Sequence, residues 1–258
     1  YIFFFFFFRF EMRRAHEMEC NAMHVHLSKL QEEAARRKQR EQGAQTTLIP
    51  TKYQNKGAGV APSSSLEHTD GHDDYSADFI GDFPSKWNTN GTGEVVTVND
   101  ESQRYLKMVP GYGLYYLPLA DDLPESYTIE FDVLTNGIDG NTSSQAKLHV
   151  QLVENKDFEN AKNSAQVSIP FTQYAPQGIQ VRNYIAGQGR TINSTVTADI
   201  RKAVINKPHF SIAVNKERFR FWVNDKKYVD IPKLIPAQKL KGVRFQVGTF
   251  KDGKEELF

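Results

Sequence analysis

Two carboxylates on one predicted strand, Glu130 and Asp132, are the best candidates in this sequence for acid–base catalysis. Side chains two residues apart point to the same face of a strand. Glycoside hydrolysis needs two carboxylates flanking the scissile bond, about 5–5.5 Å apart in retaining enzymes. The next positions on that face are Leu134 and Asn136, so the second acid is missing. We interpret Glu130 and Asp132 as the solvated face of a half-buried strand and expect no catalytic activity.

A tryptophan and two arginines on another predicted strand form the candidate ligand-binding surface. In residues 218–223, Arg218, Arg220 and Trp222 alternate with apolar residues, so they share the face opposite the core. A tryptophan on an open sheet can stack on a sugar, and an arginine beside it can hold a hydroxyl group or a carboxylate. Tyr228, on the next predicted strand, belongs to the same candidate surface.

The same side chains also have a purely structural interpretation. Trp222 can pack on a neighbouring loop or on Tyr228, and Arg220 can lie near Asp230. Aromatic cross-strand pairs are ordinary stabilisers of a sheet, which favours this second interpretation. Both stay open at the level of sequence.

Two histidine-containing clusters have the composition of metal ligands: His24 with His26, and His68, Asp70, His72, Asp73 with Asp74. A metal site fixes its ligands at about 2.0–2.2 Å and supports them with further hydrogen bonds, which a flexible linker does not provide. No Gly-rich phosphate loop or Ser-His-Asp grouping can be assembled from the spacing. We expect neither a metal nor a cofactor.

The charge balance excludes a general polyanion binder. The chain has 258 residues, a net charge of +1 and 24% charged residues, whereas nucleic-acid-binding domains carry a marked basic excess. We therefore expect no nucleic-acid partner. The single cysteine, Cys20, excludes an internal disulfide bond.

Short runs of alternating apolar residues predict an all-β domain from residue 73 onward. One helical turn at residues 157–165 is the exception that we expect. Many short antiparallel strands in one domain of this size indicate a sandwich or a barrel. The expected strands are residues 94–99, 104–109, 114–117, 127–134, 145–153, 166–171, 178–185, 195–200, 209–215, 218–224, 227–231, 243–250 and 255–258.

The centre of this pattern is a β-meander over residues 208–232. Asn215-Lys216 and Asn224-Asp225 are its expected turns, because Asn and Asp tolerate the positive φ that tight hairpins need.

The length of the second turn decides which residues are buried. A two-residue loop would place Phe219 opposite Asp230, whereas a three-residue loop would place it opposite Ile231 and would bury Val229 as well. Burying the two aliphatic side chains is worth about 1.5–3 kcal/mol each, which exceeds the roughly 1 kcal/mol cost of a left-handed Lys226. We therefore predict a loop of odd length.

The first 72 residues differ in composition from the rest. Residues 1–26 open with a phenylalanine run too short to span a bilayer, and we interpret them as low-complexity sequence that is non-native or a fragment of an anchor. Residues 27–72 predict a basic helix and a linker. We expect residues 1 to about 66 to pack little against the domain at 73–258. Residues 254–258 resemble the start of a strand, so we expect that domain to be truncated at its C-terminus.

Three motifs together resemble a known family. They are Asp78-Phe-Ile-Gly-Asp-Phe-Pro-Ser-Lys-Trp87, Tyr127-Thr-Ile-Glu-Phe-Asp-Val133, and Phe219-Arg-Phe-Trp-Val-Asn-Asp-Lys-Lys227 with Asp230-Ile-Pro232. They resemble the concanavalin A-like, laminin G-like N-terminal sandwich domain of OmpA-family outer-membrane proteins of the Bacteroidetes. That family usually has Asn-Gly where this chain has Asn224-Asp225. The resemblance covers about the last two-thirds of the chain.

The resemblance implies an all-β, concanavalin A-like jelly-roll β-sandwich with a disordered or helical N-terminal tail, located at the outer membrane or in the periplasm. We expect a non-catalytic binding or scaffold domain, with carbohydrate or a cell-envelope component as its partner. Peptidoglycan would be bound only through a missing C-terminal domain. The alternatives are a glycoside hydrolase of the same fold and a purely structural spacer.

Overall fold

A computed structural model describes residues 4–7, 73–98, 103–111, 113–118, 123–135, 137–155, 157–236 and 240–248. These residues form two seven-stranded sheets in which neighbouring strands run antiparallel. The chain crosses repeatedly between the sheets, as in a jelly roll. The predicted all-β sandwich is therefore confirmed. Among the described residues, no helix has the length and apolar character needed to cross a membrane.

The first sheet carries the predicted meander along one edge, and its strand order follows pairing rather than sequence. In that order the strands are β13 (Lys226–Ile231), β12 (Arg218–Val223), β11 (His209–Asn215), β6 (Ser126–Thr135), β1 (Phe4–Phe7), β4 (Arg104–Met108) and β3 (Gly93–Thr97).

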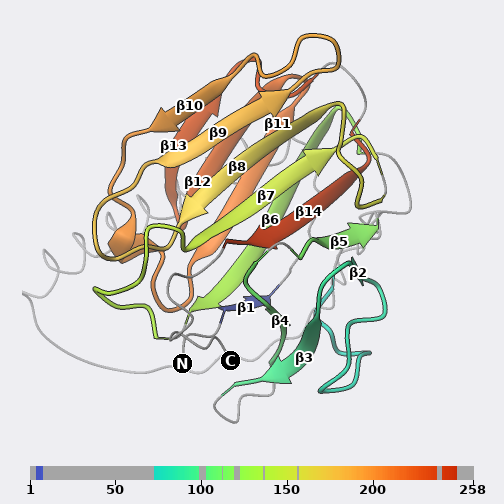
Figure 1. Cartoon of the computed structure of the whole chain (residues 1–258), viewed down its shortest axis with the longest axis vertical. Helices are drawn as coiled ribbons and strands as arrows, with labels where there is room; N and C mark the ends of the chain where they lie inside the picture. The colour runs from blue at the N-terminus through green and yellow to red at the C-terminus, as the bar shows by residue number, and fades with distance from the viewer. Residues whose placement is uncertain are drawn as a thin grey trace, which may run out of the picture. The chain divides into compact units, whose positions relative to one another are not determined.

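The second sheet lies against the first, and in Figure 1 its strands β7 and β8 lie in front of β6 and β11. Within it β14, from the end of the chain, is inserted between β7 and β5. A short 3₁₀ helix, η1 (Arg201–Ala203), precedes the return to the first sheet. In order the strands are β10 (Asn193–Val196), β9 (Ile179–Tyr184), β8 (Ser164–Pro170), β7 (Lys147–Val153), β14 (Gly242–Val247), β5 (Tyr115–Pro118) and β2 (Asn88–Thr89).

Aromatic rings from both sheets meet in the core. Phe131 of β6 lies 5.5 Å from Phe245 of β14 and 5.2 Å from Phe210 of β11, measured between ring centroids. The centroid of the Trp87 ring lies 6.0 Å from that of Phe245, with the two rings tilted by 50°. These rings are all buried, and burial of one such side chain is worth about 1.5–3 kcal/mol. The alternation read from the sequence thus places the core on the expected faces.

The N-terminal phenylalanine run contributes a strand, which corrects one expectation. β1 pairs with β6 through Phe4–Phe7 and with β4 through residues 5 and 6. It fills the place between two strands that do not pair with each other, so it satisfies backbone groups that would otherwise form two open edges. The expectation that the first 66 residues pack little against the sandwich is wrong for these four. The predicted helix and linker at 27–72 lie outside the described residues.

The motif ending in Trp87 has a structural role. Asp73 accepts a hydrogen bond of 2.9 Å from the indole nitrogen of Trp87, and both side chains are buried. Arg104 on β4 donates to the backbone oxygens of Tyr75, Ser76 and Asp78. The segment before β2 is thereby fixed to the first sheet.

The β12–β13 hairpin has both a tight turn and a buried apolar face, although its loop differs from the predicted one. Asn224 takes a φ of 52°, and Val223 faces Lys226 across a two-residue loop. A β-bulge between Phe221 and Trp222 then shifts the register, so Phe221 faces Val229. The odd-length loop was wrong, whereas the burial of Val229 was right. The extra residue that we assigned to the turn lies in the strand, at Tyr228.

This register makes Val229, rather than Tyr228, the residue on which the hairpin depends. Val229 is 1% exposed and Tyr228 is half-buried. We expect Val229→Ser to lower the free energy of unfolding by about 2–4 kcal/mol, because it removes buried apolar volume and buries a hydroxyl group. Tyr228→Ser should cost less. Urea unfolding of both variants is the measurement, and the reverse order would contradict the bulge.

Candidate functional site

The sequence-predicted binding residues lie on β12 and β13, where Arg218 and Tyr228 are occupied by other side chains of the same hairpin. Arg218 donates two hydrogen bonds to Asp230, of 2.7 and 2.9 Å, and the Lys227 ammonium group adds a third of 3.0 Å. Arg220 faces Asp230 in the cross-strand register, yet Arg218 makes the ion pair. Arg218 is thus satisfied within the hairpin, whereas the buried Nε of Arg220 has no hydrogen-bond partner among the described residues.

The two aromatic residues of that candidate surface do not form the expected pair. Because of the bulge, Trp222 faces Lys227 across the strands rather than Tyr228. The Lys226 ammonium group instead lies 4.9 Å from the centroid of the Tyr228 ring. The pocket described below is lined by none of Trp222, Arg218, Arg220 and Tyr228.

Asp132 does have a partner, which the sequence analysis missed. The β6–β11 register places His209 directly opposite, with 2.8 Å between His209 Nδ1 and Asp132 Oδ1. The hydrogen bond to Asp132 is the main cause that raises the pKa of His209 above its ordinary value. Glu130 faces Ser211. The carboxylate is thus paired with an imidazole, as a structural ion pair at the sheet surface.

The outer face of the second sheet carries a polar row that crosses all of its strands. Cross-strand pairing aligns one residue from each strand, with polar side chains throughout. Strand by strand from β2 to β10, the row is Asn88, Tyr116, Arg244, Gln151, Gln166, Arg182 and Asn193. Polar residues that alternate with core residues on every strand predict a solvated face, but only pairing over long sequence distances joins them into a line.

Hydrogen bonds fix the middle of this row. Arg182 donates to Gln166 Oε1 at 2.8 Å, which turns the Gln166 amide nitrogen toward Ser168 Oγ at 2.9 Å and His149 Nδ1 at 3.1 Å. Burial, with Arg182 and Lys147 nearby, lowers the pKa of His149 to about 4. The imidazole is therefore neutral near pH 7, as its role as a hydrogen-bond acceptor requires.

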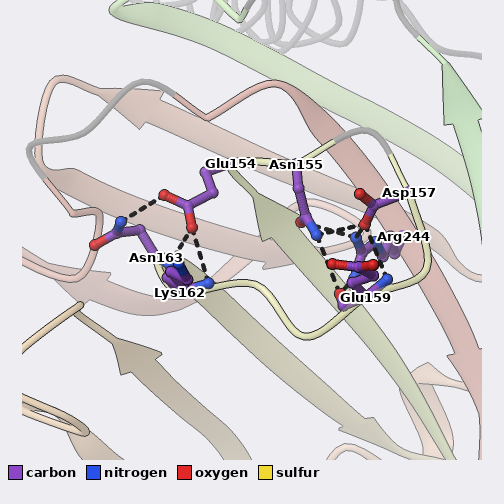
Figure 2. A network of polar contacts seen from close by, with 7 residues as sticks. All are labelled: Glu154, Asn155, Asp157, Glu159, Lys162, Asn163 and Arg244. Carbon is purple, nitrogen blue, oxygen red and sulfur yellow. Dashed lines mark hydrogen bonds and ion pairs between the residues drawn. The ribbon is translucent and has the colours of Figure 1, made fainter.

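Arg244 organises the loop above the row. Its side chain is almost fully buried, and its terminal nitrogens donate to the Glu159 backbone oxygen at 2.9 Å and to Asn155 Oδ1 at 2.8 Å. Asp157 adds a longer ion pair of 3.5 Å. Figure 2 shows these loop residues gathered around the guanidinium group. An arginine flanked by Val243 and Phe245 in a largely apolar strand was the sequence signal for this arrangement.

A second group of hydrogen bonds, centred on Glu154, stabilises the same loop. Glu154 Oε1 accepts from the backbone nitrogens of Lys162 and Asn163 at 2.8 and 3.1 Å, and Oε2 accepts from the Asn163 side chain (Figure 2). β8 then begins at Ser164. The helical turn expected at residues 157–165 is wrong: residues 157–159 and 162–163 form bends, because these side chains satisfy the loop backbone in its place.

Over this row lies an open pocket with a volume of about 730 Å³. Gln151, Gln166 and Arg182 contribute from the sheet, residues 158–162 from the loop, and Tyr184 and Arg190 from β9 and the turn after it. This volume is in the range of small-ligand sites. The pocket offers amide and guanidinium donors beside an aromatic ring that is 46% exposed, Tyr184.

The His209–Asp132 pair predicts a pH-dependent contribution to stability. Because the folded-state pKa of His209 is raised, its stabilisation is complete below the ordinary value of about 6.5 and is lost as the pH rises through the raised value. We expect Asp132→Asn to lower the His209 pKa in an NMR titration, and Glu130→Gln to lower it less. An unchanged His209 pKa in Asp132→Asn would contradict the pair.

The loop over the pocket should depend on Arg244. Arg244→Met keeps most of the buried volume but removes the donors to Asn155 and Glu159. We expect trypsin to cleave after Lys162 at least tenfold faster in this variant under native conditions, because the loop loses its anchor. Arg190→Met, which changes an exposed pocket residue, is the control. Equal cleavage rates in the two variants would show that Arg244 does not hold the loop.

No protein-family model matches the chain, and no curated protein matches it. Among solved structures, the carbohydrate binding module CBM66 from Bacillus subtilis aligns at 15% identity over 65% of this chain and 96% of that chain, with a TM-score of 0.38. Sheep galectin-11 aligns at 10% over 55% and 96%, with a TM-score of 0.35. A Bacillus licheniformis β-glucanase aligns at 9% over 69% and 86%, with a TM-score of 0.37. All three TM-scores are below 0.5, so the sandwich assignment rests on the strand order and register.

Proposed function

We propose that this chain is a non-catalytic carbohydrate-binding domain whose site is the pocket over the outer face of the second sheet. One observation carries the proposal: a row of amide and guanidinium side chains faces an open pocket with Tyr184 at its side. Planar amides and guanidinium groups hydrogen-bond to hydroxyl pairs, and an aromatic ring offers the apolar face on which a sugar ring stacks. The pocket thus offers both hydrogen-bonding groups for sugar hydroxyls and an aromatic ring for stacking.

The absence of catalysis is part of the proposal. Among the described pocket-lining residues, Glu159 is the one carboxylic acid, and hydrolysis of a glycosidic bond needs two across the scissile bond. Glu154 is committed to the loop through both of its oxygens. Asp132 lies in the other sheet and is paired with His209. A glycoside hydrolase is the alternative, and it requires a second acid within reach of Glu159. Asp157 lines an adjoining pocket with Glu159, and its carboxylate forms an ion pair with Arg244.

The setting is also a proposal. The motif ending in Trp87 resembles the sandwich domains of OmpA-family proteins, which supports a location at the outer membrane or in the periplasm. In that setting the domain would bind carbohydrate or a cell-envelope component, while peptidoglycan would be bound by a separate C-terminal domain. The DNA sequence downstream of the coding region for Phe258 tests this directly, because it would encode that domain.

Binding should depend on the pocket rather than on the first-sheet candidates. We expect a glycan array to identify saccharide ligands, and titration calorimetry to show about a tenfold loss of affinity in Tyr184→Ala, which corresponds to about 1.4 kcal/mol. Trp222→Ala is the matched control on the other sheet and should bind normally. Loss of binding in Trp222→Ala with normal binding in Tyr184→Ala would move the site to the face of β12.

The same ligands test the catalytic alternative. Prolonged incubation should leave them intact when the products are examined by chromatography. Cleavage that disappears in Glu159→Gln would overturn the non-catalytic assignment.

A further inference from the structure

The pocket contains two arginines for which the described part of the chain supplies no carboxylate. Arg182 is half-buried and donates one hydrogen bond, to the neutral amide of Gln166. Arg190 is exposed, and no ion pair joins it to an acidic residue among the described residues. Two arginines outside the pocket do have carboxylate partners: Arg218 binds Asp230, and Arg201 binds Asp199.

The charged residues that line the pocket are mostly cationic. Lys162, Arg182, Arg190 and Arg244 line it, against the single carboxylic acid Glu159. The terminal nitrogens of Arg244 are engaged by the loop and its Nε is buried, which leaves Arg182 and Arg190 as the pair that can receive a ligand. Burial and the charge of Arg190 both lower the pKa of Arg182, so an anion placed between the two groups would be stabilised.

The excess of positive charge is local. The chain as a whole carries a net charge of +1, so the field that attracts an anion belongs to this pocket rather than to the whole surface. A guanidinium group presents parallel N–H donors that match the two oxygens of a carboxylate. The neighbouring amide of Gln151 and the ring of Tyr184 suit a hydroxyl group and the apolar face of the attached sugar.

We propose that the pocket binds acidic saccharides, with Arg182 and Arg190 holding the carboxylate of a uronic acid residue. This inference rests on the proposed carbohydrate-binding function and names its ligand class. Arg182 has a second role, because it orients Gln166 and through it the contacts to Ser168 and His149. Arg190 has no such role within the described residues, so it is the cleaner position for a test.

The test is calorimetry of the full chain with oligosaccharides of galacturonic, glucuronic and mannuronic acid, each beside its carboxyl-reduced form. At least one acidic oligosaccharide should bind tenfold more tightly than its reduced counterpart. Arg190→Gln should weaken binding of the acidic form about tenfold and of the reduced form less than twofold. Lys233→Gln removes one positive charge from an exposed turn outside the pocket and should change neither affinity.

The outcomes separate this inference from the function on which it rests. If acidic and reduced forms bind equally and Arg190→Gln has no effect, while Tyr184→Ala still weakens binding, the sugar site stands and the inference is wrong. If a sulfated galactose oligosaccharide binds and no uronic acid oligosaccharide does, the carboxylate assignment is wrong. If no saccharide binds to the pocket, the proposed function itself fails.

Discussion

The burial of one guanidinium group, that of Arg244, constrains the surface on which the function depends. Its side chain is 2% exposed at the centre of a sheet face, where a charge without partners would cost several kcal/mol. The residues that satisfy it, Asn155 and Glu159, belong to the loop between β7 and β8. That loop is therefore held over the sheet rather than away from it. The wall of the pocket is a consequence of satisfying a buried charge.

The two outer faces of the sandwich differ in how their polar groups are used. On the first sheet, Arg218 and Lys227 both bind Asp230, and His209 binds Asp132, so the charged groups neutralise one another. On the second sheet, Arg182 binds only a neutral amide and Arg190 lies at the rim of the pocket. A surface whose charges are paired has little to offer a ligand. The second face retains donors that are oriented by the fold but not consumed by it.

Local pattern predicted most of the strands, because alternation of apolar residues with a period of two survives in each segment separately. In the meander, the position of the turn at Asn224 and the burial of Val229 were predicted correctly, whereas the odd length of the loop was wrong. The bulge at Tyr228 allows a two-residue loop and a buried Val229 together. The pocket could not be predicted, since it depends on register between strands far apart in sequence, such as Gln151 with Arg244. Trp222 was predicted as a binding residue because a single aromatic residue can be recognised in the sequence. A row of glutamines and arginines can be recognised only once the strands are paired.

The proposed function requires that the ligand binds over the polar row of the second sheet. Backbone amide NMR spectra recorded during titration with an oligosaccharide identified by the array test this claim directly, because every strand reports separately. We expect the chemical shift changes to concentrate at Gln151, Gln166, Arg182 and Tyr184 and in the loop before Ser164, while β12 and β13 remain unchanged. Shifts concentrated at Trp222 and Tyr228, with the second sheet unaffected, would contradict it.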